Sequence, residues 1–525
     1  MIKQLINHRS ETIGGGALIL AGFTIIGSIL GVLRDSLFAS RLGVGSQLDI
    51  YYAAFRIPDF VYSIFIMGAI SAGFIPIFTA HLKKSKEEAG SLLSSIFILF
   101  GLFMILVSAL LIIFAEPILK NLLAGFDSDK ISLAVNLTRL MMIQPIILGF
   151  SAIISSVLQI FKLFVATALA PAMYNLGIIT GIIFFYPRFG LSGLAYGVIL
   201  GAILNLLILL PSYFHLKLPS KIDFSDSIKG LKQMFFVMIP RTLSILINQG
   251  YFLVLTFAAS FMVAGSLGVF SLANNIQGFP YVIFTLSFVS ASFPVFSRLF
   301  ADKDDLAFKQ ILNNTIRQIL FFIIPLSGLF LVFRAQIVRL LLGYGRFDWS
   351  ATENTIAVLS ILTLALIFQS LSYLFVRVFF SRGESIKPFV GALLSYSLGA
   401  ILCFILGRSF GVIGLAWAYV LTNTLYFFVM FVMLKRKLKF WSVRELIQPI
   451  LKICVSSFFA CVVGYLMLNL LAPIFGTNTV KGLFLQAILS GSLALFAFWM
   501  IGKKLGLEDL ANFKNLIFNR LKLKK

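Results

Sequence analysis

An apolar segment occurs twice in this chain. Residues 189–210 read FGLSGLAYGVILGAILNLLILL, and residues 410–431 read FGVIGLAWAYVLTNTLYFFVMF. A second pair of segments, 51–79 and 270–297, aligns at an offset of 219 positions. Parallel repeats of several apolar spans are a common plan of secondary transporters, which hold their substrate at the interface between the two halves. The repeat therefore predicts a duplicated membrane protein and indicates transport.

Composition excludes a soluble domain. Hydrophobic residues make up 59% of the chain and charged residues 12%, whereas the charged fraction of a soluble domain is roughly 25%. Apolar stretches of about 20 residues, bounded by charges or turn signals, predict about fourteen transmembrane helices. We expect an all-α integral membrane protein with two pseudo-symmetric six-helix lobes and two extra C-terminal helices. The expected spans are 13–33, 50–78, 92–114, 132–161, 164–185, 191–213, 234–262, 267–296, 319–333, 351–380, 389–406, 412–434, 453–471 and 483–501.

The net charge is +23, and many of the Lys and Arg residues are concentrated in loops on alternate sides of the predicted spans. They follow the second, sixth, twelfth and fourteenth spans, and all of them fall on one side of the membrane if both termini are cytoplasmic. Such a basic surface lies against anionic membrane lipids, so we expect no nucleic-acid partner. The domains we predict are an N-lobe at 1–215, a cytoplasmic linker at 216–233, a C-lobe at 234–435, spans thirteen and fourteen at 436–502, and a basic cytoplasmic tail at 503–525.

No combination of residues predicts catalysis. The three histidines lie far apart, and none is near a Ser, Cys or carboxylate partner. A Gly-rich loop for nucleotide phosphates is absent from the sequence, and the three cysteines lie inside apolar stretches without metal-ligand spacing. We therefore expect a transporter rather than an enzyme, with no cofactor and no bound metal.

Several ionisable residues lie at or inside the predicted spans. An Arg near the bilayer centre costs roughly 2.5–3.5 kcal/mol, so an Arg that persists there usually faces a cavity or a partner. Arg also makes paired, planar contacts with phosphate oxygens. These residues predict a cationic cavity for a phosphorylated headgroup, although the members at span ends could instead be interfacial caps or gate salt bridges. They are Arg34, Asp35, Asp49, Arg56, Asp59, Arg139, Arg241 and Arg377.

The run GSILGVLRDSLFASRLGVGSQLDIYYAAFRIPDF at 27–60 resembles the opening of the MurJ/MviN lipid II flippases. This family is a branch of the superfamily that also contains multidrug and polysaccharide exporters. Further matches extend from the fifth span to the twelfth. They lie at 170–177, 193–197, 343–347 and 380–388.

The resemblance implies export of lipid II, the undecaprenyl-pyrophosphate-linked peptidoglycan precursor, from the inner to the outer leaflet of a bacterial cytoplasmic membrane. Alternating access of the two lobes would move the headgroup, and an apolar groove in the last two spans would hold the polyprenyl tail. Cell-wall synthesis machinery is a candidate partner. The implied substrate-binding residues are Arg34 and Arg56, with Arg241 and Arg377 as replacements for missing family residues, and the gate or cavity carboxylates are Asp35, Asp49 and Asp59.

Three arginines of the family pattern are missing. Ile29, Tyr62 and Asn275 stand at or near their positions. The substrate could therefore be another polyprenyl-linked oligosaccharide. A cation-coupled multidrug exporter would need a buried acidic residue in mid-span, and spans seven, eleven and twelve offer none. A membrane-bound glycosyltransferase or a scaffold of the cell-wall machinery is the alternative from another class.

Overall fold

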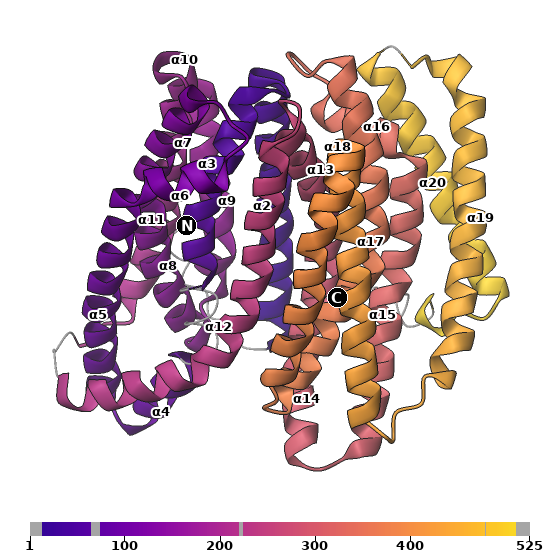
Figure 1. Cartoon of the computed structure of the whole chain (residues 1–525). Coiled ribbons are helices and arrows are strands. Elements are labelled where there is room, and N and C mark those ends of the chain that lie inside the picture. Colours follow the sequence, from indigo (N-terminus) through magenta and orange to yellow (C-terminus); the bar gives the residue numbers. More distant parts are fainter. Residues whose placement is uncertain (1–12, 65–73, 220–223, 478, 511–525) are drawn as a thin grey trace. The chain divides into compact units, whose positions relative to one another are not determined.

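The computed structural model describes residues 13–64, 74–219, 224–477 and 479–510, with backbone only for some stretches, 224–241 among them. These residues form helices and no strand (Figure 1). The elements are α2 (Ile13–Leu42), α3 (Ser46–Tyr62), α4 (Ile75–Lys84), α5 (Lys86–Ile113), α6 (Ala115–Leu122), α7 (Ser128–Met141), α8 (Ile143–Ile160), α9 (Phe164–Thr180), η3 (Gly181–Phe185), α10 (Tyr186–Phe189), α11 (Leu191–His215), α12 (Phe224–Ser260), α13 (Ser266–Pro280), η4 (Tyr281–Leu286), α14 (Ser287–Ala301), α15 (Asp305–Val332), α16 (Arg334–Leu342), α17 (Trp349–Ser381), α18 (Ile386–Lys437), α19 (Arg444–Phe475) and α20 (Val480–Lys504).

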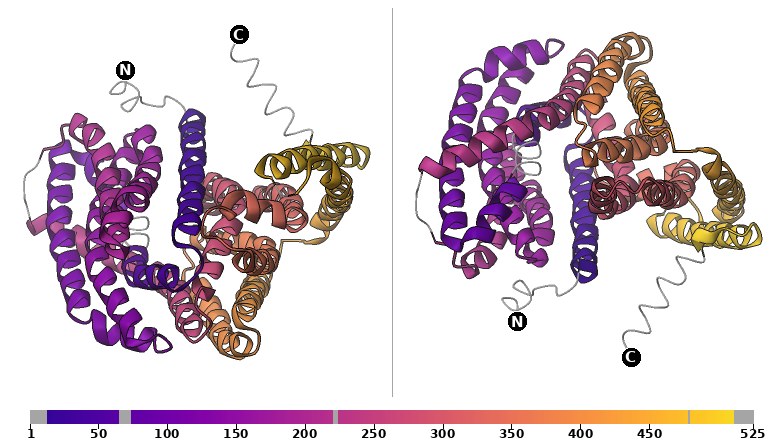
Figure 2. Two further views of the ribbon diagram at one scale, coloured as in Figure 1. Left: turned by 90° about the horizontal axis from the view of Figure 1, so that it is seen from above. Right: turned by 90° about the horizontal axis from the view of Figure 1, so that it is seen from below.

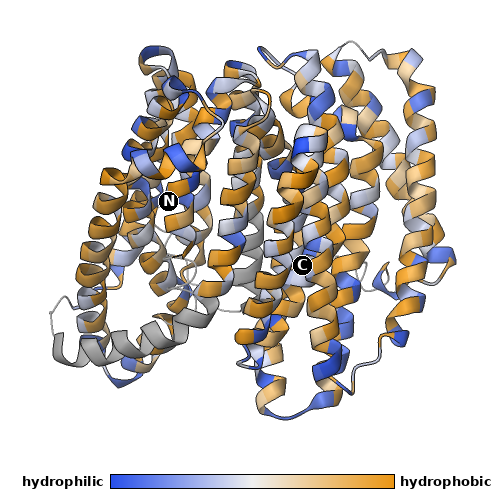
Figure 3. Cartoon of the chain, in the orientation of Figure 1, coloured by the Kyte–Doolittle hydropathy of each residue, from blue (hydrophilic) through white to orange (hydrophobic). Residues whose placement is uncertain are grey.

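Within the described residues, eleven helices are long and apolar enough to cross a membrane. Helix α18 counts once among them, although it carries two expected spans, 389–406 and 412–434, on either side of Gly411. Figure 3 shows that α5 and α19 are largely hydrophobic along their length. Both helices carry many exposed large hydrophobic side chains, as expected of helices that face lipid. The all-α membrane fold is thus confirmed, whereas the count of fourteen spans stays a prediction.

The repeat in the sequence is also a repeat of backbone geometry. Gly190 and Gly411 open the two repeated segments with nearly the same left-handed conformation, φ 57°, ψ −141° and φ 58°, ψ −138°. Three residues later in each copy, Gly193 and Gly414 lie so close to the preceding helix that a Cβ atom would come within 2.4 Å and 1.9 Å of a backbone oxygen. Only glycine fits both kinds of position. The two copies therefore fold into the same tight helical corner.

Residue contacts divide the chain into two compact units. The first comprises Met1–Ser271, Tyr344–Ala351 and Tyr396–Leu415, and the second comprises Leu272–Gly343, Thr352–Ser395 and Ala416–Lys525. In the first unit, α9 packs on both α2 and α11 (Figure 1). Its contact with α11 is a glycine seam, because a Cβ on Gly177 would come within 2.2 Å of the Cα of Gly201. This seam brings the backbones of α9 and α11 into close contact.

In the second unit, α19 and α20 lie side by side, as all three views show (Figures 1 and 2). Their buried residues recur every four positions, which is the spacing of a close helix–helix contact. The buried row on α20 consists of Gly482, Gln486, Ser490, Ala494, Phe498 and Gly502, and the facing row on α19 includes Ser456, Ala460, Gly464 and Leu468. The two extra helices form a tightly packed hairpin, and α19 also packs against α15.

Candidate functional site

Arg34 is held in place from two sides. It lies on α2, where Nε and Nη2 donate to Oδ1 of Asp35 at 2.9 and 2.8 Å, and Nη1 donates to Oδ1 of Asn175 on α9 at 3.0 Å. The amide of Asn175 donates in turn to the carbonyl of Gly27 at 3.0 Å. Asp35 is only 4% exposed. A buried carboxylate of this kind needs a cationic partner, so Arg34 and Asp35 act as one unit.

Arg56 lies on α3 of the same unit. Its Nε donates to the hydroxyl of Thr256 on α12 at 3.0 Å, and its guanidinium lies 5.4 Å from the ring centroid of Phe252. The terminal amino groups of Arg56 make no hydrogen bond to the described residues. Asp59, one turn further along α3, lies within electrostatic reach of Arg56. The guanidinium is therefore oriented by the protein but keeps donors for a ligand.

Tyr52 lies one helical turn before Arg56 on α3. The charges of Arg34, Asp35 and Arg56 all contribute to its electrostatic environment. Tyr174, the neighbour of Asn175 on α9, lies within reach of Arg34 and Asp59. We call this group the polar cluster; it consists of Arg34, Asp35, Tyr52, Arg56, Asp59, Tyr174 and Asn175.

Asp49 lies outside the polar cluster and contacts the start of α13. Its Oδ1 accepts a hydrogen bond from the amide of Gly268 at 2.7 Å, and its Oδ2 accepts one from the amide of Gly265. A carboxylate at this place is stabilised by the helix dipole. Asp49 and Gly268 are 219 positions apart, which is the offset of the repeat, so the contact joins equivalent positions of the two copies.

The remaining predicted arginines lie elsewhere. Arg377 belongs to the second unit, where Nη2 donates to the hydroxyl of Tyr373 at 2.7 Å and the guanidinium lies 5.8 Å from the ring centroid of Phe293. Arg139 donates to the carbonyl of Ile112 at 3.2 Å, at the end of α5. Arg241 lies on α12, but its side chain is outside the described part of the structure.

Some members of the cluster were not predicted from the sequence as site residues. Asn175 occurs in one of the matching family segments, but neither its bond to Arg34 nor that of Thr256 to Arg56 has a local signal, because 141 and 200 positions separate the partners. The partners of Asp49 are backbone amides, and such partners cannot be predicted from residue type. The N-terminus of α13, directly after Gly265, was the one available hint.

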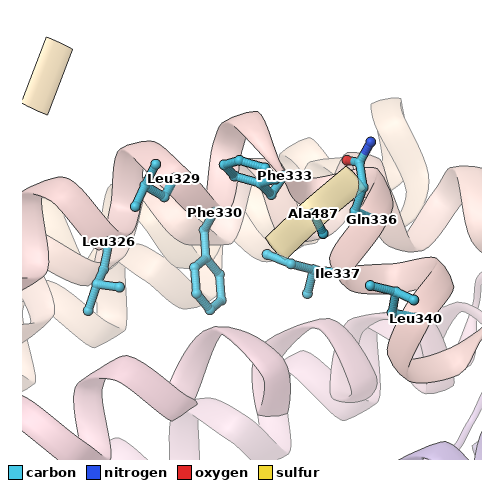
Figure 4. A pocket seen from close by; sticks show the side chains of 8 residues that line it. All are labelled: Leu326, Leu329, Phe330, Phe333, Gln336, Ile337, Leu340 and Ala487. Carbon is cyan, nitrogen blue, oxygen red and sulfur yellow. The ribbon is translucent and has the colours of Figure 1, made fainter. Parts of the chain in front are cut away.

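An apolar pocket of about 230 Å³ lies between α15, α16 and α20 in the second unit (Figure 4). The amide oxygen of Gln336 is buried at this pocket without a hydrogen-bond partner in the described part of the chain. The lining residues are Leu326, Leu329, Phe330, Phe333, Gln336, Ile337, Leu340 and Ala487. The pocket is thus lined almost entirely by apolar groups, as a site for a hydrocarbon chain would be.

Many apolar helices in a duplicated fold, with partly buried arginines on two neighbouring helices of one unit, define a multi-pass membrane transporter. A solved MATE-family multidrug resistance transporter of the MOP superfamily has the same fold, with a TM-score of 0.68 and 17% identity over 81% of this chain and 98% of that one. The family described as lipid II flippase MurJ matches residues 38–513, so the chain belongs to that family. A solved lipid II flippase MurJ in an inward closed conformation is 26% identical over 92% of this chain and 98% of its own, with a TM-score of 0.75. A probable lipid II flippase MurJ of Thermotoga maritima is 29% identical over 75% of this chain and 80% of its own. The predicted family is thereby confirmed.

Proposed function

We propose that this protein moves lipid II from the inner to the outer leaflet of a bacterial cytoplasmic membrane, and that the polar cluster binds the pyrophosphate. The observation that carries the proposal is the guanidinium of Arg34, which is held from two sides directly after the predicted span 13–33. Asp35 and Asn175 orient it, and Arg56 stands in the same unit with terminal amino groups that bind none of the described residues. Two oriented guanidinium groups suit a diphosphate, because each can make paired contacts with phosphate oxygens.

Movement of the headgroup follows an alternating-access cycle in this proposal. The lobes at 1–215 and 234–435 rock about the bound headgroup, while the tail stays in the bilayer. Asp49 closes one side as long as it holds the amides of Gly265 and Gly268. Moving one elementary charge across 100 mV is worth about 2.3 kcal/mol, so the membrane potential is sufficient to drive a resetting step.

The polyprenyl tail would lie against the two extra helices. The seam between α19 and α20 is closed by small residues, since a Cβ on Gly464 would come within 3.3 Å of the Cβ of Ala494. A groove therefore has to use an outer face of the hairpin. The apolar pocket between α15, α16 and α20 supports the α20 face (Figure 4).

Complementation tests the proposal. The gene for this chain is expressed in cells whose own lipid II flippase is depleted, and growth and lipid II on the outer leaflet are measured. We expect growth to be restored and surface lipid II to return. Failure in cells that produce the protein in the membrane, together with restored export of another polyprenyl-linked glycan in a matching depletion strain, would assign it that other substrate.

A further inference from the structure

Two tyrosines of the polar cluster have hydroxyl groups that no described residue binds. The hydroxyl oxygens of Tyr52 on α3 and Tyr174 on α9 are buried, and neither has a hydrogen-bond partner in the part of the chain that the structure describes. Two other tyrosine hydroxyls of the first unit have protein partners: that of Tyr396 accepts from Asn248 at 2.8 Å, and that of Tyr186 donates to Gln47 at 2.7 Å. A buried hydroxyl without a partner destabilises a protein. Two such hydroxyls within the polar cluster could each be satisfied by an acceptor atom of a ligand.

Packing fixes both rings. The centroid of the Tyr52 ring lies 5.6 Å from that of Tyr51 and 6.3 Å from that of Phe38. The Tyr174 ring lies in the glycine seam between α9 and α11, where a Cβ on Gly201 would come within 3.1 Å of it. A rigid ring holds its hydroxyl at one place, so neither group can turn away to find another partner.

The charges around the hydroxyls indicate an anion. Tyr52 lies one helical turn before Arg56 on α3, and Tyr174 directly precedes Asn175, which accepts from Arg34; the electrostatic environment of both tyrosines includes Arg34. A phosphate oxygen bound to these arginines would be a strong acceptor for a neutral O–H donor next to it.

We propose that Tyr52 and Tyr174 are substrate-binding residues, and that their hydroxyls donate hydrogen bonds to the pyrophosphate oxygens of the lipid-linked substrate. The inference rests on the proposed function, because it adds two neutral donors to the same headgroup site. It accounts for selectivity as well. Fixed donors around a diphosphate reject ligands whose oxygens do not reach them, whereas two arginines alone attract any anion.

The test uses purified full-length protein with the variants Tyr52→Phe and Tyr174→Phe, each of which removes one oxygen and keeps the ring. Binding of lipid II and of undecaprenyl pyrophosphate is measured together with the melting temperature. We expect each variant to bind both lipids about tenfold more weakly or worse, as for the loss of a hydrogen bond to a charged group. The melting temperature without ligand should stay equal or rise, because the variants remove a buried, unpartnered hydroxyl.

Tyr396→Phe is the matched control, since its hydroxyl has a protein partner. It should lower the melting temperature and leave both affinities unchanged. Unchanged affinity for both lipids in Tyr52→Phe and Tyr174→Phe would overturn the inference, as would a lower melting temperature that accompanies the loss of binding. A loss for lipid II alone would place the hydroxyls against the sugar and overturn the pyrophosphate assignment. Wild-type protein that binds neither lipid would refute the proposed function itself.

Discussion

At the scale of residues, Arg34 is proposed to bind phosphate and also pairs with the buried carboxylate of Asp35, so a single substitution affects both substrate binding and stability. Arg34→Ala removes a phosphate donor but also leaves the buried carboxylate of Asp35 without its cationic partner, which costs about 3–5 kcal/mol of stability. The double variant Arg34→Ala/Asp35→Asn removes the buried charge as well. We expect it to accumulate close to the wild-type level while its affinity for lipid II falls by about 10- to 100-fold.

Arg34→Lys keeps the charge but not the planar fork, so its affinity should lie between those of the double variant and the wild type. Arg139→Ala is the control, because Arg139 binds a backbone carbonyl outside the polar cluster. Binding by titration and membrane accumulation by immunoblot separate the two effects. Wild-type affinity in the double variant would show that Arg34 serves the fold alone.

Individual charges were predictable because lipid penalises them, and their partners were not. An Arg in an apolar run stands out in any sequence, so Arg34 and Arg56 were found. Asn175 and Thr256 are ordinary residues of apolar helices, and only the packing of α2 on α9 and the approach of α12 to α3 bring them to the arginines. The burial of the Tyr52 hydroxyl, which no described residue binds, likewise depends on tertiary packing and has no local sequence signal.

At the scale of elements, polar contacts attach the two extra C-terminal helices to α15 of the second unit. On α15, Lys309, Asn313 and Arg317 follow one another at four-residue spacing on one face of the helix. Lys309 and Asn313 bind Glu445 at the start of α19, and Arg317 binds Glu508 and Asp509 beyond the end of α20. These contacts fasten the extra hairpin to the second unit. The helices themselves followed from hydropathy, whereas this attachment depends on long-range pairs that hydropathy does not report.

The loop between α17 and α18 has a second such contact, and it is sensitive to pH. Glu384 accepts from Lys387 at 2.6 Å and from Lys437, at the end of α18, at 3.1 Å. Burial acts to raise the pKa of Glu384, but the two lysines outweigh it and lower that pKa below its usual value. A lowered pKa stabilises the fold above the unfolded-state pKa of about 4.3, and this contribution is lost as the pH falls through the folded-state pKa.

We therefore expect Glu384→Gln to lower the free energy of unfolding by about 1 kcal/mol at neutral pH, since the pairs are partly exposed. The deficit should be constant down to about pH 5 and shrink below the ordinary Glu pKa of about 4.3. Melting curves of the wild type and the variant, recorded from neutral pH to below the ordinary Glu pKa, measure this deficit. Glu87→Gln, at an exposed carboxylate with no ion pair among the described residues, is the control. A deficit that persists unchanged in acid would mean that the carboxylate acts through packing rather than charge.

At the scale of the whole molecule, duplication predicts more than any single motif. The same glycine corner at Gly190 and Gly411, and the meeting of Asp49 with its repeat equivalent Gly268, follow from one ancestral half used twice. Arg56 also has a repeat equivalent at the same offset of 219 positions, the uncharged Asn275. The two halves have thus kept their backbone geometry while their charges diverged, and the arginines of the polar cluster lie on the first half.

The orientation of the duplicated fold in the membrane is a prediction that labelling can test. We expect both termini and the loops around Lys84 and Lys439 to be cytoplasmic and the segment at 343–348 with the adjacent Ser350 to be external, because the basic loops all lie on one side under the positive-inside rule. In a variant with all three cysteines replaced by Ala, we introduce Lys84→Cys, Lys439→Cys or Ser350→Cys, each at an exposed position of the structure. An impermeant thiol reagent should label the Ser350→Cys variant in intact cells and the two lysine variants only after permeabilisation. Labelling of either lysine variant in intact cells would reverse the orientation, and with it the direction of export.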